Sequence, residues 1–373
     1  MASVPVVASF GAHVTPGRVD GSTVTPPTNG ESGDPEAGDP DAGEHDTGGT
    51  DSGAEEGEEV EDTEEVEEEV EEEVEVEEEA PSSAGTLSAW SLYVEPEGHA
   101  TRQADLWRDS DPASAALMDR MGDEPLAVWV GDWMSDVAGS VDEAVTAGGD
   151  KLRTIVVYNI PLRDCGAWSA GGARDVAAYA AFIAEVARGL DNRSALVILE
   201  PDALGLTDCL SAGELIERHA MMASAVETLS SAGAEVYIDA GQADWIDASV
   251  MASHLSAVGV ANAAGFALNV AHTHSTADTV VYAEELRAVL GTDAHYVVDT
   301  GRNGLGPDAE ESWCNPLGRS VGASPTLSTG VTGLDALLWV KAPGESDGEC
   351  NGGPAAGDWW ADYALGLVER STG

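Results

Sequence analysis

The stretch ALVILEPDALG (195–205) runs five aliphatic residues directly into two acids, Glu200 and Asp202, that flank a proline. Residues 195–199 predict a strand buried on both faces, because the run is apolar without alternation and short for a helix. The two acids have two interpretations. They can begin a turn or cap the next helix. They can also be catalytic, since α/β proteins place their chemistry at the C-terminal ends of parallel strands.

Similar short apolar runs recur along the chain after residue 84. They predict strands at 126–130, 154–160, 195–200, 235–240, 265–270, 295–300 and 336–341. Ala-rich or amphipathic stretches between them predict helices at 173–189, 212–231, 246–256 and 276–290. Strand–helix repeats indicate a mainly parallel sheet, and seven or eight units in about 290 residues favour a closed barrel over an open sheet. No GxGxxG motif follows the first strand, which argues against a dinucleotide site.

The composition is strongly acidic, with 69 Asp and Glu against 16 Lys and Arg and a formal charge of −53. Residues 84–373 alone hold 42 acids and 15 bases, and their only lysines are Lys151 and Lys341. Such a domain repels itself in dilute buffer, whereas molar salt screens the repulsion. The charge therefore predicts a salt-loving source and argues against nucleic acid or an anionic membrane as partner.

The N-terminal part differs in composition from the rest. Residues 1–30 are too few to form a core, and we expect a remnant or extension with little structure. Residues 31–83 pass from Gly, Asp and Pro to nearly pure Glu with Val, which predicts a disordered acidic linker before a domain at 84–373. The first residues lack the basic and apolar regions of a signal peptide, so we expect a leader to have been removed. No apolar run approaches the roughly 20 residues of a membrane span.

All four cysteines follow residue 84: Cys165, Cys209, Cys314 and Cys350. They show no CxxC or Cys/His spacing of a zinc site, so we expect no metal. An even count suits two disulfides and an extracellular location.

Several predicted strands end with a carboxylate: Asp164, Asp202, Asp239, Asp299, and the pair Glu345 and Asp347. Any one of these alone is more often a helix cap or turn former. Five strands converging on one barrel face would instead cluster the acids, which drives their pKa values apart so that one stays protonated while others ionise. Glycoside hydrolysis needs this combination of a neutral acid and anionic partners.

All ten tryptophans lie after residue 84, and several stand near predicted strand ends: Trp107, Trp129, Trp133, Trp168, Trp245 and Trp313. Their flat faces suit stacking on the apolar faces of glucose rings. The alternative is that Trp129 and Trp339 belong to the core, and we favour it for Trp339, which lies inside the run ALLWVK.

Seven segments resemble, in order, the signature blocks of glycoside hydrolase family 6 cellulases. They are VVYNIPLRDCGAWSAGG, ILEPDALG, VYIDAG, GFALNV, DTGRNGLGP, WCNP and WVKAPGESDGEC, which lie between about Trp90 and Val368. The resemblance implies a distorted, incomplete TIM-like parallel β/α barrel. It also implies inverting hydrolysis of β-1,4-glucan without a cofactor.

The resemblance assigns catalytic roles by motif. It implies that Asp202 is the general acid, that Asp164 raises its pKa and helps activate water, and that Asp239 orients it. It implies that Tyr158 presses the sugar at the cleavage point out of its chair. Lys341, Glu345 and Asp347 would line the same subsite, with Asp347 as the candidate base.

The resemblance also assigns binding and structural positions. Sugar-binding residues would be Trp107, Trp129, Trp245, Trp313 and Asn269. The disulfides would be Cys165–Cys209 and Cys314–Cys350.

The sequence departs from the family pattern at three places. A Ser that helps hold the nucleophilic water is replaced by Ala170, with Ser169 beside it. DAGH reads DAGQ, with Gln242, and a common Asn-aromatic pair is replaced by His272 and Thr273. Two histidines at 272 and 274 without a third ligand do not predict a metal site.

Three functions are compatible with these observations. We expect a secreted, monomeric endoglucanase of a halophile. Internal cleavage is expected because the segments after DTGRNG and GESDGEC are short and leave the cleft open. The alternative in the same family is a cellobiohydrolase, which encloses its substrate in a tunnel. A non-catalytic glucan-binding cell-surface protein would not require Asp202, Asp164 and Asp239 together.

Overall fold

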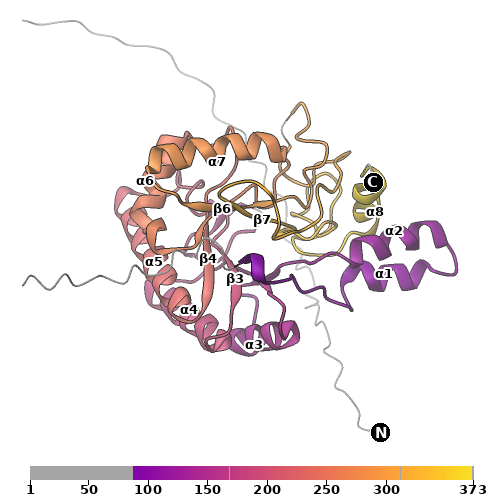
Figure 1. The fold of residues 1–373 in the computed structure, drawn as a ribbon, viewed down its shortest axis with the longest axis horizontal. Helices are drawn as coiled ribbons and strands as arrows, with labels where there is room; N and C mark the ends of the chain where they lie inside the picture. Colours follow the sequence, from indigo (N-terminus) through magenta and orange to yellow (C-terminus); the bar gives the residue numbers. More distant parts are fainter. Residues whose placement is uncertain (1–86, 168, 311, 372–373) are drawn as a thin grey trace, which may run out of the picture. The chain divides into compact units, whose positions relative to one another are not determined.

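The computed structural model describes residues 87–371 except 168 and 311, so the predicted extension (1–30) and linker (31–83) lie outside the described residues. Seven parallel strands form one sheet in chain order (Figure 1). The strands are β1 (Val128–Val130), β2 (Thr154–Val157), β3 (Ala195–Leu199), β4 (Ala234–Asp239), β5 (Gly265–Leu268), β6 (His295–Asp299) and β7 (Leu334–Leu338). Each lies within a predicted strand or overlaps it.

The sheet curls into a barrel that does not close. β1 and β7 are the two ends of the hydrogen-bonded order. Between their flanks, the Ala127 amide donates to the Trp339 carbonyl at 3.3 Å, and the Trp129 indole donates to the Val340 carbonyl at 2.9 Å. The distorted, incomplete barrel is confirmed, whereas the closed barrel favoured by strand spacing alone is not formed.

Helices cover the outside of the curled sheet (Figure 1). They are α3 (Val137–Gly148), α4 (Val176–Leu190), α5 (Ala212–Ser231), α6 (Ala248–Val258) and α7 (Thr276–Leu290). The last four match the predicted helices. Their starts follow the sequence, since the side chains of Asp175, Ser211 and Ser275 cap α4, α5 and α7.

A second group of helices was not predicted: α1 (His99–Trp107), α2 (Pro112–Gly122) and α8 (Ala361–Glu369). Together they bury a cluster that includes Met118, Tyr363 and Leu367. Trp339 is 4% exposed within this cluster, so the core interpretation of that residue is confirmed. Short 3-10 helices complete the fold at Leu87–Ala89, Asp164–Gly166 and Val260–Asn262.

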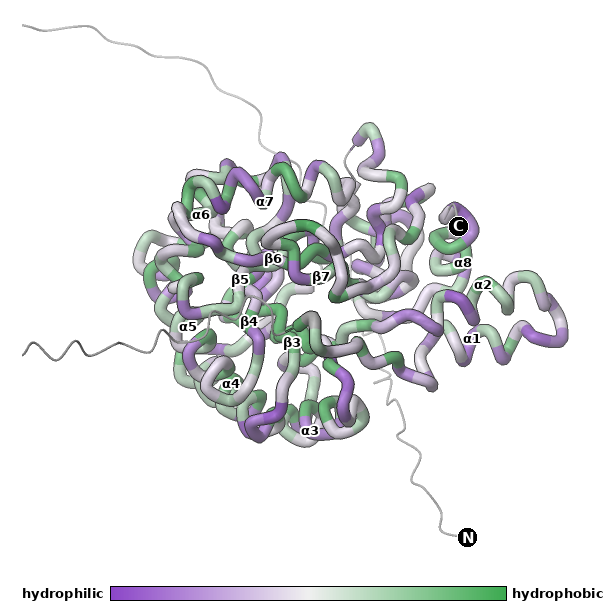
Figure 2. The backbone as a smooth tube through the Cα atoms, in the orientation of Figure 1, coloured by the Kyte–Doolittle hydropathy of each residue, from purple (hydrophilic) through white to green (hydrophobic). Residues whose placement is uncertain are grey.

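The run 195–199 is buried on both faces, as predicted. Leu196 and Ile198 point into the barrel interior, whereas Val197 and Leu199 pack against the outer helices. Figure 2 shows the strands as a largely green centre, with purple segments concentrated on the surrounding helices and loops. The sheet is therefore a rigid base for the loops at its C-terminal ends.

Both expected disulfides are present, Cys165–Cys209 and Cys314–Cys350. No helix in the described part of the chain is long and apolar enough to cross a bilayer.

Candidate active site

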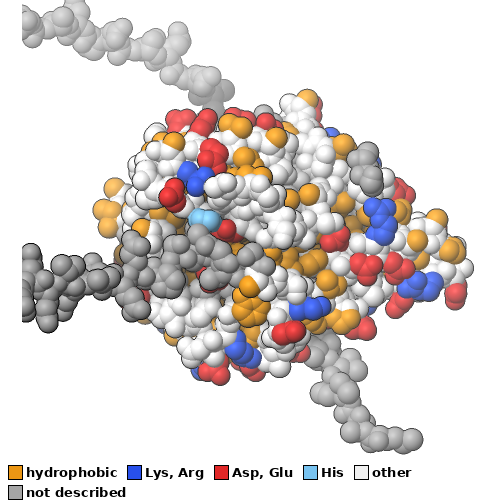
Figure 3. All heavy atoms as spheres, viewed as in Figure 1, with side chains coloured by type: hydrophobic (Ala, Val, Ile, Leu, Met, Phe, Trp, Pro, Cys, Tyr) orange, Lys and Arg blue, Asp and Glu red, His pale blue; other side chains and the backbone are white. Residues whose placement is uncertain are grey.

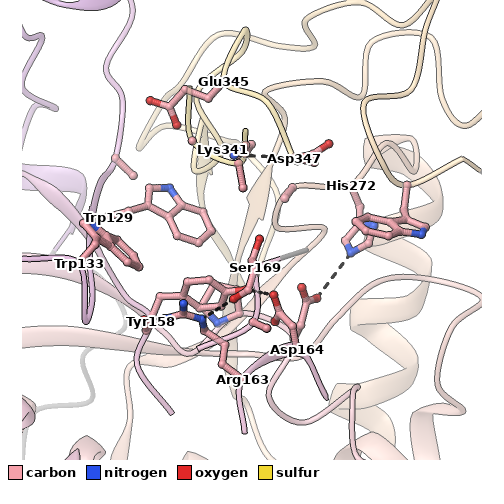
Figure 4. Close-up of a pocket in the computed structure, with 18 of the residues that line it drawn as sticks. Trp129, Trp133, Tyr158, Arg163, Asp164, Ser169, His272, Lys341, Glu345 and Asp347 are labelled. Atoms are coloured by element: carbon pink, nitrogen blue, oxygen red, sulfur yellow. Dashed lines mark hydrogen bonds and ion pairs between the residues drawn. The ribbon is translucent and has the colours of Figure 1, made fainter. Parts of the chain in front are cut away.

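The C-terminal ends of the strands surround a cavity of about 750 Å³ (Figure 4). Carboxylates, bases and aromatic rings line it together. The acids are Asp164, Asp202, Glu345, Asp347 and Asp358, the bases are Arg163, His272 and Lys341, and the aromatic residues are Trp129, Trp133, Tyr158 and Trp313.

The two acids after β3 have different roles. Glu200 is fully buried and accepts hydrogen bonds from the backbone amides of Asn159 and Ile160, at 2.9 Å each. It thereby ties the end of β3 to the end of β2, and burial raises its pKa to about 7. Asp202 instead lines the cavity, on a backbone held at a φ of 65°. Glu200 therefore has a structural role, which is to bridge two strands and not to cap the next helix, and Asp202 is the acid of the pair that faces the cavity.

Asp239, at the end of β4, supports Asp202 from below. Its Oδ2 accepts from the Asp202 amide at 2.9 Å and from the Gly241 amide at 3.1 Å. Burial, followed by the charge of Asp202, raises the pKa of Asp239 well above its ordinary value. Its Oδ1 is buried without a hydrogen-bond partner in the described residues. A protonated Asp239 thus has a hydrogen-bond donor that no described residue uses.

Asp164 and Tyr158 form a pair on the β2 side of the cavity. The Tyr158 hydroxyl donates to Asp164 Oδ2 at 2.5 Å. Burial raises the pKa of Asp164 to about 6, despite the Tyr158 hydrogen bond, and the charge of Asp202 adds to the shift. Burial and the neighbouring Asp164 charge also raise the pKa of Tyr158, which stays neutral. Asp164 therefore changes protonation in the mildly acidic range and can hold or release a proton there.

Asp347 is an anion fixed by cations. Its Oδ2 accepts from Arg302 at 2.6 Å and from the Asn315 amide at 2.8 Å, and Lys341 Nζ lies 3.8 Å from Oδ1. Burial alone would raise the pKa of Asp347, but Arg302 and Lys341 outweigh it and hold the pKa below its ordinary value. A carboxylate stabilised in this way is a weak base, so the geometry favours an electrostatic role over proton abstraction. Burial raises the pKa of its neighbour Glu345.

Asn269 and Asp299 do not line the cavity. Asn269 is fully buried, and its side chain bonds to the backbone of His274 and Asp299. Asp299 accepts from four backbone amides, those of Ala271, Gly301, Val340 and Lys341. Both side chains therefore build the loops of the site and have little capacity left for a sugar.

Comparison with known proteins shows which family has this arrangement. The profile of the glycosyl hydrolases family 6 matches residues 87–371. The chain belongs to this family. Endoglucanase A of Cellulomonas fimi is 42% identical over 287 residues, which are 75% of this chain and 61% of that enzyme. The chain thus spans less than two thirds of that relative.

A solved structure and a more distant relative complete the comparison. The endoglucanase Cel6 of Mycobacterium tuberculosis, in complex with a thio-cellobioside ligand, is 38% identical with a TM-score of 0.72. The match covers 77% of this chain and 99% of that one. A probable 1,4-beta-D-glucan cellobiohydrolase of Aspergillus niger is 27% identical over 364 residues, covering 78% of this chain and 79% of that one.

The four tryptophans that the family 6 motifs assign to sugar binding occupy different surroundings. Trp129 and Trp313 line the cavity, and Trp313 is 50% exposed. Trp245 packs at the edge of the site, over Gly205, where an added Cβ would lie only 2.4 Å from its ring. Trp107 packs beside the cluster of α1, α2 and α8 and does not line the cavity.

Sequence reasoning missed several residues of this family 6 site. Arg163 donates to the Tyr158 carbonyl and to Asp132, and its guanidinium lies 4.5 Å from the Tyr158 ring centroid. Arg302 is the buried partner of Asp347. Trp133 was expected near a strand end but was given no role by the family motifs, and it lines the cavity and is 54% exposed. Arg163 and Arg302 lie inside the RDCG and DTGRNG motifs quoted above. The signal that could have found them is that the acids of the site need cationic side chains as partners. Ser169 and Ala170 both line the cavity.

Proposed function

We propose that this protein hydrolyses β-1,4-glucosidic bonds inside glucan chains, with inversion of anomeric configuration. The observation that carries the proposal is the position of Asp202. It lies in the cavity wall, with its backbone amide on the carboxyl of Asp239, and near an Asp164–Tyr158 pair whose acid has a pKa of about 6. The family assignment agrees with this reading.

Asp202 acts as general acid and protonates the oxygen of the leaving sugar. Asp239 holds the Asp202 backbone amide and thereby fixes the position from which the Asp202 side chain enters the cavity. Asp164 receives or relays a proton from water, and Tyr158, fixed by Asp164 and Arg163, presses on the sugar ring at the cleavage point. Lys341, Glu345 and Asp347 form the opposite wall of the same subsite.

Internal cleavage is favoured over release from chain ends. Trp133 and Trp313 line the cavity while remaining 54% and 50% exposed, so the faces available for sugar stacking are open to solvent. The endoglucanases of Cellulomonas fimi and Mycobacterium tuberculosis are 42% and 38% identical to this chain, against 27% for the probable cellobiohydrolase of Aspergillus niger. A tunnel enzyme of the same family is the second candidate.

Viscosity and reducing ends of carboxymethylcellulose, measured together, test the proposal. Endo-acting hydrolysis lowers viscosity quickly for each reducing end formed. Slow viscosity loss at the same number of reducing ends would identify a cellobiohydrolase. No reducing ends at any salt concentration would identify a binding protein.

Inversion gives a second test on soluble cello-oligosaccharides. Water attacks directly in an inverting enzyme, with the carboxyl groups roughly 6.5–9.5 Å apart, so early products from a β-linked substrate carry the α configuration. Proton NMR of the anomeric region in the first minutes, before mutarotation, measures the ratio. Mainly β product would contradict the assignment.

We infer that the protein is secreted into a saline medium and binds glucan as a monomer. Two disulfides suit an oxidising compartment. Red acidic side chains are scattered over the face drawn in Figure 3, and the cavity itself gathers five carboxylates. Salt ions would screen the repulsion among the surface acids and among the five carboxylates of the cavity.

Stability and activity are expected to rise together from ~0.1 M toward multi-molar NaCl, as the Debye length shrinks from about 10 to 3 Å. Residues 84–373 carry 27 excess negative charges, which repel one another at low ionic strength. Thermal unfolding and initial rates over a NaCl series measure the effect. Deletion of residues 1–83 should leave the dependence almost unchanged. A truncated enzyme that is fully stable and active without salt would refute this account.

A further inference from the structure

His272 faces the proposed general acid directly. Its Nε2 lies 3.6 Å from Asp202 Oδ1, with 15% of the His272 side chain and 26% of the Asp202 side chain exposed. A dashed line marks this contact in Figure 4. The distance is within ion-pair range and slightly beyond a good hydrogen bond, so protonation of either group acts on the other.

The loop that carries His272 is held firmly. The His272 amide donates to the Asn269 carbonyl at 3.0 Å, and the Ala271 amide donates to Asp299 Oδ2 at 3.0 Å. Arg302 donates to the Ala271 carbonyl. Ala271 is held at a φ of 61°, a conformation that non-glycine residues adopt only when their surroundings impose it. The backbone contacts of this loop therefore fix the position of the His272 imidazole.

Trp245 packs against the imidazole on the side of the β4 loop. The two ring centroids are 5.9 Å apart at an angle of 51°. The same indole covers Gly205, whose amide donates to the Asp202 carbonyl at 3.1 Å. Loops from β3, β4 and β5 thus meet around the His272–Asp202 contact.

The charges around the contact act in opposite directions. Asp202 lies close enough to Asp164 and Asp239 for its charge to contribute to the raised pKa of both of those acids. A protonated His272 favours the ionised form of Asp202. The remaining titratable or charged groups of the site are Tyr158, Arg163, Asp299, Arg302, Lys341, Glu345, Asp347 and Asp358, of which Asp299 is bound by backbone amides and Arg302 is paired with Asp347.

We propose that His272 is a positioning residue that pairs with Asp202 and sets the upper pH limit at which Asp202 still carries its proton. The inference rests on the proposed role of Asp202 as general acid. The imidazolium also pairs the Asp202 carboxylate that remains after proton transfer, which would otherwise face two other acids. His272 therefore confines activity to lower pH and stabilises the state that follows bond cleavage.

The first test is the pH profile of kcat/KM for His272→Asn and His272→Gln at constant NaCl. Both variants remove the cation and keep a polar side chain. The alkaline limb should move up by about one pH unit, since an opposite charge at this distance shifts a carboxyl pKa by about that amount or more. A merely structural role would lower kcat without moving the limb. The control is His254→Gln, because His254 pairs with His219 outside the cavity, and its profile should match the parent.

The second test does not depend on activity. Coupling between two sites is reciprocal, so Asp202→Asn should lower the NMR titration midpoint of the His272 ring by about one pH unit. The His254 midpoint should stay where it is. The His272 signal is assigned by its loss in His272→Gln.

The outcomes separate the inference from the proposed function. An inactive Asp202→Asn variant, with unmoved alkaline limbs in the His272 variants and an unmoved His272 midpoint, would overturn the inference alone. A fully active Asp202→Asn variant would overturn both. Shifted alkaline limbs in the His272 variants and a shifted His272 midpoint in Asp202→Asn would support both the inference and the proposed role of Asp202.

Discussion

Asp202→Asn is expected to lower kcat on unactivated β-glucan by at least ~10²-fold, the usual scale of general acid catalysis. The amide has the shape of the carboxyl but cannot supply its proton to the leaving oxygen. Folding should persist, because the contact that ties this residue to Asp239 is made by the Asp202 backbone amide. Initial rates of reducing-end formation, compared with circular dichroism spectra, measure both effects.

Two comparisons sharpen this result. An aryl cellobioside with an acidic phenol as leaving group needs little protonation, so Asp202→Asn should lose much less activity on it. Asp208→Asn is the matched control, because Asp208 lies exposed on the same loop and outside the cavity lining. Equal losses on both substrates would point to a disturbed site instead of a missing acid. Near-parent turnover on glucan would reject the role of Asp202.

The sequence predicted the strands because their signal is local. A fully buried parallel strand must be apolar on both faces, and β3 is the clearest case. The helices that were missed are α1, α2, α3 and α8. Of these, α1 and α2 bury their apolar residues partly against α8 and Trp339, which lie far along the chain. The failure to close also depends on distant parts, since it involves only the two ends of the sheet.

The site shows the same division. The strand-end acids were visible in the sequence, but their separation into cavity-lining and structural groups was not. Asp202 lines the cavity, whereas Glu200 and Asp299 spend their oxygens on backbone amides. That difference is set by where neighbouring loops place their N–H groups. The pairing of Asp347 with Arg302 and of Asp202 with His272 likewise joins separate loops.

Removal of the Cys165–Cys209 disulfide, by Ser at both positions, is expected to lower the free energy of unfolding by about 4 kcal/mol. The two cysteines are 44 residues apart, and chain entropy predicts a loss of this size for such a loop. The activity should also fall by more than the loss of folded protein alone would cause. Cys165 follows Asp164 directly, and Leu162, Asp164 and Cys165 all have φ between 49° and 57°. The left-handed conformation costs non-glycine residues roughly 1–2 kcal/mol each, so this turn depends on its surroundings.

The second disulfide supplies the matched control, because Cys314 and Cys350 are 36 residues apart. In the chain-entropy account the two losses should differ by only about 0.2 kcal/mol. Urea unfolding of both double variants at one NaCl concentration measures the losses. A much larger loss for Cys165–Cys209 would mean that native contacts around Asp164, more than the unfolded chain, determine the effect. No loss for either variant, or four free thiols in the parent protein, would contradict the prediction, because the Cys165–Cys209 bridge would then not hold the loops that carry Asp164 and Asp202.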